Sequence, residues 1–375
     1  MKTERPARIQ DLVGILNALY PPAFAESWDN VGLHIGDPAA PLNRVLLCLD
    51  PSEMALNAAR AAGAEAILTH HPLIFNPLKN ITSGNETGRL VLAAARAGIA
   101  VICAHTNLDR APNGLNDWLA ALLGVPAALP LAAGDDALLK LVVFVPAGYE
   151  DTVAEAMFKG GAGQIGGYDR CSFQSAGIGT FRPGEKSRPF LGRSGEMERA
   201  SEVRLETIVP RHRLHRTLEN MRKAHPYEEV AYDLLPLSNQ RPDMGLGRIG
   251  RLPEATTLEL FAERVKTSLG AASLRLVGEP QARIAKVALC GGSGASLLAE
   301  AIRQGADVLV TGDLKYHEAR SAQAQGLALI DAGHFATEHL MVRGLAQVLR
   351  DEIPRRGLAM EIIEMEGETE PFRVF

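Results

Sequence analysis

The stretch AILTHHPLIF, residues 66–75, decides the expected fold. Its apolar start is typical of a buried strand, and this pattern stops at Thr69. Two adjacent histidines, His70 and His71, follow at once and are succeeded by Pro72. Because open α/β sheets place ligands at the carboxyl ends of their strands, both histidines lie where a site is expected. Consecutive residues that leave a strand point in different directions, which favours the binding of two ions over the chelation of one.

Helix-like and strand-like segments alternate on both sides of this stretch. In the first 125 residues the pattern predicts helices at 9–19, 53–62 and 88–97 and strands at 44–49, 66–69 and 100–103. The same rhythm returns with strands at 286–289, 307–310 and 328–330 and helices at 295–304, 316–325 and 336–351. Strands separated by helices of this length predict right-handed βαβ units and a largely parallel or mixed sheet.

The middle of the chain has a different texture. The pattern predicts strands at 139–145 and 230–235, helices at 150–158 and 212–223, and further strand-like pieces between them. Such a βαββαβ-like order is typical of a ferredoxin-like α+β module. We therefore expect an α/β metal-binding domain with a mixed sheet, split into residues 1–130 and 245–375, and an inserted domain at 137–238. The flanks 124–134 and 238–247, rich in Ala, Pro, Gly and polar residues, are the expected joints.

The composition is that of an ordinary folded protein. Of the 375 residues, 46% are apolar and 22% charged, and 39 basic against 44 acidic residues give a net charge of −5. This balance argues against a strong global attraction to nucleic acid or anionic lipid. The sequence shows no signal peptide and no long apolar run, so we expect a cytoplasmic protein without membrane contact. Four widely spaced cysteines without a CxxC pair are expected to be buried, reduced thiols.

Two further strand ends carry residues of the same chemical type. The segment AVICAHTNLD, residues 100–109, delivers His105 and Asp109 just after a strand. The segment LALIDAGHFATEHL places His334 after a strand and Glu338 four residues later, where both share a helix face. Each pattern by itself is usually incidental. Their convergence at three strand ends, with imidazole and carboxylate groups, predicts a site for divalent metals.

Three other motifs leave alternatives open. In TGDLKYHEA, residues 311–319, the polar side chains of Asp313, Lys315, Tyr316 and His317 are either substrate contacts and proton donors or parts of a helix cap. The run CGGSGAS, residues 290–296, is better explained as a tight turn than as an anion-binding loop. In the insert, HPYEE at 225–229 is better explained as a turn leading into a strand than as a second metal site.

Several of these segments together resemble one family. SWDNVGLHIGD, LTHHPLIF, AHTNLD, TGDLKYHEA and DAGHFATE are similar to the GTP cyclohydrolase I type 2 homologs, also called Nif-three-like dinuclear-metal hexameric proteins. YDRCSFQSAGIGTFRPG and HPYEEVAYDLLPL resemble the CutA-like or PII-like insert of its longer members. The resemblance implies a homohexamer with a dinuclear site. It assigns the metal ligands to His70, His71, Asp109, His334 and Glu338, places His105 beside them, and makes the loop at Trp28 part of the cleft wall, with core packing as the alternative.

The expected function follows from that site. Two divalent ions per subunit, whether zinc, iron, manganese or nickel, promote hydrolysis, and His105 or His317 is expected to shuttle protons. The substrate is expected to be a nucleotide-like or phosphate-bearing small molecule, and the family label implies opening of the imidazole ring of GTP. The alternative is a non-catalytic metal-binding or regulatory oligomer. A ring that binds nucleic acid is less favoured, because the chain is acidic.

Overall fold

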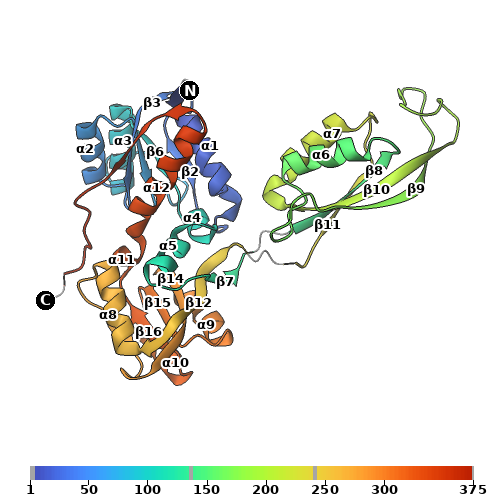
Figure 1. Cartoon of the computed structure of the whole chain (residues 1–375). Coiled ribbons are helices and arrows are strands. Elements are labelled where there is room, and N and C mark those ends of the chain that lie inside the picture. The colour runs from blue at the N-terminus through green and yellow to red at the C-terminus, as the bar shows by residue number, and fades with distance from the viewer. Residues whose placement is uncertain (1–4, 135–137, 240–242, 374–375) are drawn as a thin grey trace. The chain divides into compact units, whose positions relative to one another are not determined.

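The computed structural model describes residues 5–134, 138–239 and 243–373. It divides into two compact units, one made of Met1–Gly134 with Pro242–Phe375 and the other of Asp135–Arg241 (Figure 1). The split unit contains mixed α/β layers, in agreement with the α/β class expected from the sequence. Within the described residues, no helix is both long and apolar enough to cross a bilayer.

A five-stranded sheet forms the first layer of the split unit. Its strand order is β18 (Glu361–Glu364), β4 (Arg44–Cys48), β5 (Ala66–Thr69), β6 (Ala100–Cys103) and β2 (Gly32–Ile35), and only the β6–β2 pair is antiparallel. Alternate side chains face opposite sides of a strand. Thus Leu46 and Ile67 pack towards α2 (Glu53–Ala62) and α3 (Glu86–Ala97). Leu47 and Leu68 pack in a second core with α1 (Ile9–Leu19) and α12 (Leu340–Arg355).

A six-stranded sheet forms the second layered structure of this unit. Its order is β13 (Arg275–Val277), β16 (Ala328–Asp331), β15 (Val308–Gly312), β14 (Arg283–Ser293), β12 (Gly245–Thr257) and β7 (Leu129–Ala133), with β16, β15 and β14 parallel. One face packs on α5 (Leu115–Leu122) and α8 (Leu258–Leu269). The other face packs on η3 (Ala295–Leu297), α9 (Leu298–Arg303) and α10 (Tyr316–Ala324).

Short elements complete the split unit. They are β1 (Arg5–Arg8), β3 (Pro41–Leu42) and β17 (Leu358–Ala359), which form a small sheet, and η1 (Pro22–Phe24), α4 (Thr106–Arg110) and α11 (His334–Glu338). The four cysteines are free, as expected; three of them are buried, but Cys171 is partly exposed.

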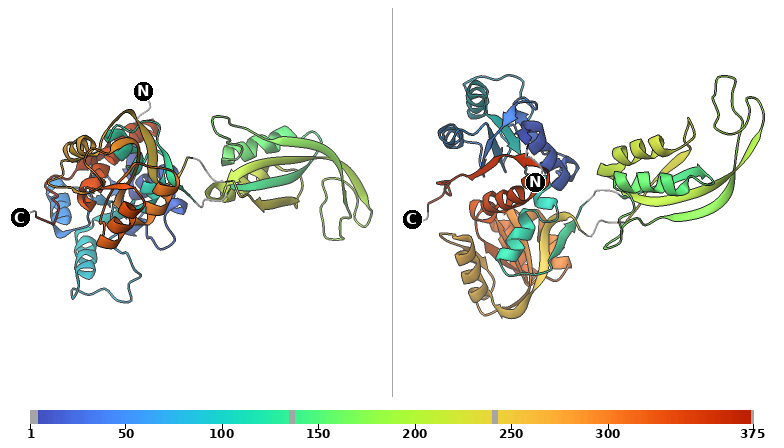
Figure 2. Two further views of the ribbon diagram at one scale, coloured as in Figure 1. Left: turned by 90° about the horizontal axis from the view of Figure 1, so that it is seen from below. Right: turned by 45° about the horizontal axis from the view of Figure 1, so that its top comes forward.

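The second unit has the element order β8 (Leu138–Pro146), α6 (Glu150–Gly160), β9 (Phe173–Phe181), β10 (Glu198–Pro210), η2 (Arg211–Arg213), α7 (Leu214–Ala224) and β11 (Tyr232–Pro236). Its four strands pair antiparallel in the order β11-β8-β10-β9. Helices α6 and α7 lie together on one face of this sheet, and β9 and β10 extend past them (Figures 1 and 2). Among the described residues of this unit, no helix packs on the other face of the sheet.

The sequence pattern missed several features of the fold. The flank 124–134 is not only a joint, because it contains β7, which pairs antiparallel with β12. Part of the flank 238–247, residues 240–242, lies outside the described residues, and its end already belongs to β12. The helix expected at 336–351 begins earlier and is divided into α11 and α12.

A buried arginine joins two parts of the split unit. Arg248 on β12 is 1% exposed, and its guanidinium donates to the carboxylate of Asp117 on α5. It also donates to the carbonyls of Gly245 and Gly247 at 2.8 Å and of Ala111 at 2.8 Å. Because a buried charge requires such partners, this network fixes α5 and the end of α4 against the six-stranded sheet.

Candidate metal centre

The five expected metal ligands come from three strand ends in the two sheets of the split unit. His70 and His71 follow β5 directly, and Asp109 lies in α4, which follows β6. His334 and Glu338 are the first and last residues of α11, which follows β16. The structure brings all five side chains together, because each lies 3.7 Å or less from another of the five.

Three of these side chains converge on one point. Nε2 of His71 and Nε2 of His334 each lie 2.9 Å from Oε2 of Glu338, and the two nitrogens lie 3.3 Å apart. Because bonds to divalent metals of this type are about 2.0–2.2 Å long, donors on one ion are at most ~4.4 Å apart. The three atoms therefore fit around a single ion.

The other ring nitrogen of each histidine fixes which atom carries the proton. Nδ1 of His71 lies 2.7 Å from Oδ1 of Asp50, and Nδ1 of His334 lies 2.7 Å from Oδ2 of Asp313. The hydrogen bond from His71 lowers the pKa of Asp50, so this carboxylate is ionised and only accepts. Each Nδ1 therefore donates, and when the imidazole is neutral, as metal binding requires, the lone pair of Nε2 points inward. Three acceptor atoms face one another, an arrangement that a cation stabilises.

A second set of donor atoms lies next to the first. Nδ1 of His70 lies 2.9 Å from the carbonyl oxygen of Ala104, so its Nε2 also presents a lone pair. This Nε2 lies 3.5 Å from Oδ1 of Asp109 and 3.7 Å from Oε1 of Glu338. Both Nε2 of His70 and Oδ1 of Asp109 are buried without a hydrogen bond to any described residue. Buried polar atoms are rarely left so, because each costs about 1–3 kcal/mol, and a metal ion would satisfy them.

His105 belongs to this second set. Donor nitrogens of His70, His71 and His105 all lie within 4.8 Å of one another. Nδ1 of His105 donates to Oδ1 of Asp29 at 2.9 Å, and Asp29 also accepts from the backbone N–H and the hydroxyl of Thr106. Although burial opposes it, the hydrogen bonds from His105 and Thr106 lower the pKa of Asp29 to about 2. The tautomer of His105 is therefore fixed in the same way as those of His71 and His334.

Gly292 leaves space for Glu338, whose carboxylate oxygens face both sets of donor atoms. Gly292 has φ +61°, and a Cβ atom there would lie 2.0 Å from Oε1 of Glu338. The backbone N–H of Gly292 also donates to Oγ1 of Thr337 at 2.9 Å, next to Glu338 in α11. Residue 292 therefore has to be glycine both for its backbone conformation and for the position of Glu338.

The rest of the glycine run is held by side chains of its own unit. The N–H of Gly291 donates to Oδ1 of Asn116 at 2.9 Å, and that of Gly294 donates to Oγ1 of Thr311 at 2.8 Å. Since these donors are occupied, the run does not form a cradle for an anion. It is the end of β14 followed by a turn, in keeping with the preferred interpretation of the sequence.

Without a cation, the cluster retains protons. Although burial opposes it, hydrogen bonds to Asp50 and Glu338 raise the pKa of His71 to about 10. The hydrogen bond to Glu338 raises the pKa of His334 to about 9. Burial raises the pKa of Asp109. A bound cation would replace these protons, because ligands coordinate in their deprotonated forms.

Other candidates are placed less centrally. His317 is exposed in the first turn of α10 and contacts the ring of Tyr316, with no polar contact to the cluster in the described part of the chain. Trp28 is 56% exposed, which excludes core packing, and its ring lies 6.1 Å from that of His105 and 5.7 Å from that of Phe75.

The structure adds one residue to the site that the sequence pattern did not indicate. Asp50, which orients His71, was not predicted. The sequence signal that could have indicated it is its position directly after the apolar run RVLLCL, which contains β4.

In HPYEE, His225 uses both ring nitrogens, one with the carbonyl of Phe144 at 3.0 Å and one with the N–H of Tyr227 at 3.1 Å. This bonding supports the turn interpretation.

The comparison with known proteins gives the family. The model of the family described as Duf34/NIF3 (NGG1p interacting factor 3) matches residues 7–371. This chain belongs to the Duf34/NIF3 family. Among relatives of this NIF3 protein, the GTP cyclohydrolase 1 type 2 homolog of Halalkalibacterium halodurans is 41% identical over 364 residues, covering 97% of this chain and 98% of the relative. The protein of the same name from Bacillus subtilis is 40% identical over 364 residues, covering 97% of each chain.

Solved structures agree with this assignment. A Bacillus cereus protein related to NIF3 has a TM-score of 0.88 and 39% identity with this NIF3 family member, over 99% of this chain and 100% of that chain. The Staphylococcus aureus protein SA1388 has a TM-score of 0.80 and 31% identity, over 99% of both chains. The resemblance deduced from the sequence motifs is therefore confirmed.

Proposed function

We propose that this protein is a dinuclear metal-dependent hydrolase that acts on a nucleotide-like or phosphate-bearing small molecule. One observation carries the proposal. The Nε2 lone pairs of His70, His71 and His334 meet oxygens of Asp109 and Glu338, while each Nδ1 is occupied by an acceptor. Without a cation, His71 and His334 have to hold additional protons, and Nε2 of His70 and Oδ1 of Asp109 stay without a hydrogen bond, so a divalent cation would satisfy the whole set.

The five side chains divide between two ions in this proposal. His71, His334 and Oε2 of Glu338 would hold one ion. His70, Asp109 and Oε1 of Glu338 would hold the other, and the ring of His105 lies beside them. Glu338 spans both positions, which would reduce the repulsion between two cations.

Two divalent cations in such a site supply Lewis acidity and lower the pKa of water towards neutrality. The chain contributes the groups that orient the substrate and move protons. His105 is the better placed proton carrier, because its ring is 5.1 Å from that of His70 and Asp29 fixes its tautomer. His317 remains a candidate only if the substrate reaches α10. The exposed ring of Trp28 offers a flat surface against which a base can stack.

We further propose that the second unit is a ferredoxin-like insert and that the protein is a cytoplasmic homohexamer. The element order β8-α6-β9-β10-α7-β11 supports the first point. Support for the assembly comes from the family resemblance.

The function is tested on purified protein loaded separately with zinc, iron, manganese or nickel. GTP loss and formate release are measured first, followed by a panel of nucleotides and phosphoesters. Turnover that disappears in Asp109→Ala and Glu338→Ala, but not in the surface control Glu361→Ala, supports the enzyme. Bound metal without turnover on any of these compounds supports the non-catalytic metal-binding alternative.

A further inference from the structure

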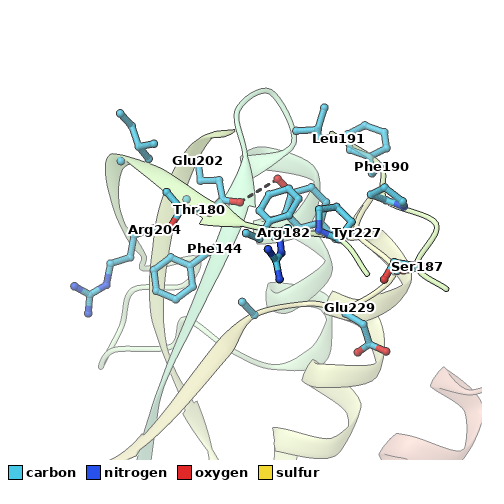
Figure 3. Close-up of a pocket in the computed structure, with 18 of the residues that line it drawn as sticks. Phe144, Thr180, Arg182, Ser187, Phe190, Leu191, Glu202, Arg204, Tyr227 and Glu229 are labelled. Atoms are coloured by element: carbon cyan, nitrogen blue, oxygen red, sulfur yellow. Dashed lines mark hydrogen bonds between the residues drawn. The ribbon is translucent and has the colours of Figure 1, made fainter. Parts of the chain in front are cut away.

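A cavity of about 560 Å³ lies in the second unit, on the sheet face opposite to α6 and α7 (Figure 3). The strand register shows which residues form the floor of this cavity. Arg204 on β10 is opposite both Phe144 on β8 and Ser175 on β9, and Glu202 is opposite Gly177. The alternate residues of β8 and β10 pack instead against α6 and α7. Its size is within the range of small-molecule sites, about 300–1,000 Å³.

A buried carboxylate stands in this cavity. Glu202 is 8% exposed, and Oε1 accepts a hydrogen bond from the hydroxyl of Tyr227 at 3.0 Å, which is the dashed contact in Figure 3. Its other oxygen lies above Gly179, where a Cβ atom would be only 2.0 Å from Oε2. Among the described residues, Oε2 has no recorded hydrogen-bond partner. A side chain at position 179 would collide with this carboxylate, so the position of Glu202 requires glycine there.

Aromatic rings surround the carboxylate. Phe144, Phe181, Phe190 and Tyr227 line the cavity, and the ring of Tyr227 lies 5.9 Å from that of Phe181 and 6.2 Å from that of Phe190. Burial and the hydrogen bond to Glu202 raise the pKa of Tyr227, so its hydroxyl stays protonated and donates. The site thus combines flat apolar walls with one acceptor group.

From this arrangement we propose that the insert binds a planar nitrogen heterocycle with two adjacent N–H donors, as in the edge of a guanine base. A carboxylate only accepts hydrogen bonds, so its ligand has to donate. The glycine floor and aromatic walls favour a flat ring that stacks. The rim carries both Arg182 and Glu229, which gives no preference for an anionic tail. The nucleoside guanosine is therefore the appropriate probe.

An arginine side chain from another protein or a second copy of this chain presents similar N–H groups. The cavity volume of about 560 Å³ favours a fused heterocycle, which is larger than a guanidinium group. The experiment separates these sources by titrating guanosine, inosine, which lacks the exocyclic amine, and N-acetylarginine amide into the full chain by calorimetry. Guanosine is expected to bind with one site per chain, and inosine at least roughly tenfold more weakly, because one hydrogen bond to a charged acceptor is lost. Binding of the arginine derivative as tight as guanosine, or no binding of guanosine, overturns the proposal.

Variants tie the binding to this cavity. Glu202→Gln replaces an acceptor oxygen by an N–H donor and is expected to abolish guanosine binding, whereas Glu219→Gln on the exposed face of α7 leaves it unchanged. Tyr227→Phe keeps the wall but removes the hydrogen bond to Glu202, so binding weakens without disappearing. Circular dichroism melting checks that each variant is folded.

The inference is independent of the proposed hydrolase. Guanosine binding is expected to persist in Asp109→Ala, which disables the metal centre. If binding is lost in that variant and retained in Glu202→Gln, the ligand sits at the metal centre and the insert site is disproved.

Discussion

Nε2 of His71 lies 3.3 Å from Nε2 of His334, although the partner of each Nδ1 leaves both atoms with a lone pair. Two acceptors at this distance, with Oε2 of Glu338 2.9 Å from each, repel one another unless a proton or a cation lies between them. A divalent cation is therefore expected to bind between these atoms, and the residues around them to control its affinity.

Metal removal is expected to lower stability. A cation that binds only the folded state adds about 2.7 kcal/mol to the free energy of unfolding when its concentration is ~100 times Kd. Thermal melting is compared between chelator-stripped protein and protein reloaded with each metal. The melting temperature should rise on reloading in the wild type and stay unchanged in Glu338→Ala. An equal rise in both would show that the stabilising ion binds elsewhere.

Glu338 and Asp109 are expected to differ in how many ions they control. Glu338 presents one oxygen to His71 and His334 and the other to His70, so Glu338→Gln should lose both ions. The carboxylate of Asp109 lies 3.5 Å from Nε2 of His70, in the second set of donor atoms, so Asp109→Asn should retain the ion of the first set. Elemental analysis after gel filtration gives the two stoichiometries. Identical metal content in the two variants would contradict the bridging role.

Asp50 is expected to act through His71. Asp50→Asn weakens the acceptor at Nδ1 and lets the imidazole adopt the other tautomer, so metal affinity should fall by roughly 10–100-fold. Competition with a chromogenic chelator measures the change, and Asp351→Asn on the surface of α12 is the control. Unchanged affinity would mean that His71 is oriented without its carboxylate.

Gly292 and Gly305 make a matched pair. Both have a left-handed backbone, with φ +61° and +69°, but only at Gly292 would a Cβ atom meet Glu338. Gly292→Ala is therefore expected to lose metal. Gly305→Ala is expected to be destabilised only by the backbone strain that both substitutions cause. Metal content and melting temperature are measured together. Equal losses of metal in the two variants would assign the effect to strain instead of to Glu338.

Removal of the buried guanidinium is expected to destabilise the split unit strongly. Arg248→Met removes the guanidinium from the carboxylate of Asp117 and the carbonyl of Ala111, with an expected loss of about 1–3 kcal/mol. Arg251→Met, on the same strand but exposed, should change stability little. Urea unfolding gives both values, and a loss below 1 kcal/mol in Arg248→Met would show that water takes over these contacts.

The sequence by itself determined the parts of this protein that depend on local patterns. Apolar runs that stop at Thr69, Cys103 and Ile330 gave the strand ends to within one residue, because burial on both faces of a parallel sheet requires such runs. The histidines and carboxylates that follow these runs gave the candidate ligands, and the motifs gave the family.

Only the tertiary structure decided how these residues work together. The pairing of His71 with Asp50, the place of Gly292 under Glu338 and the burial of Arg248 against Asp117 join residues from separate elements. The periodicity of one segment does not predict such contacts, because they depend on how separate strands and helices pack against one another. The cavity around Glu202 arose in the same way, from a strand register that places a carboxylate above a glycine of the neighbouring strand.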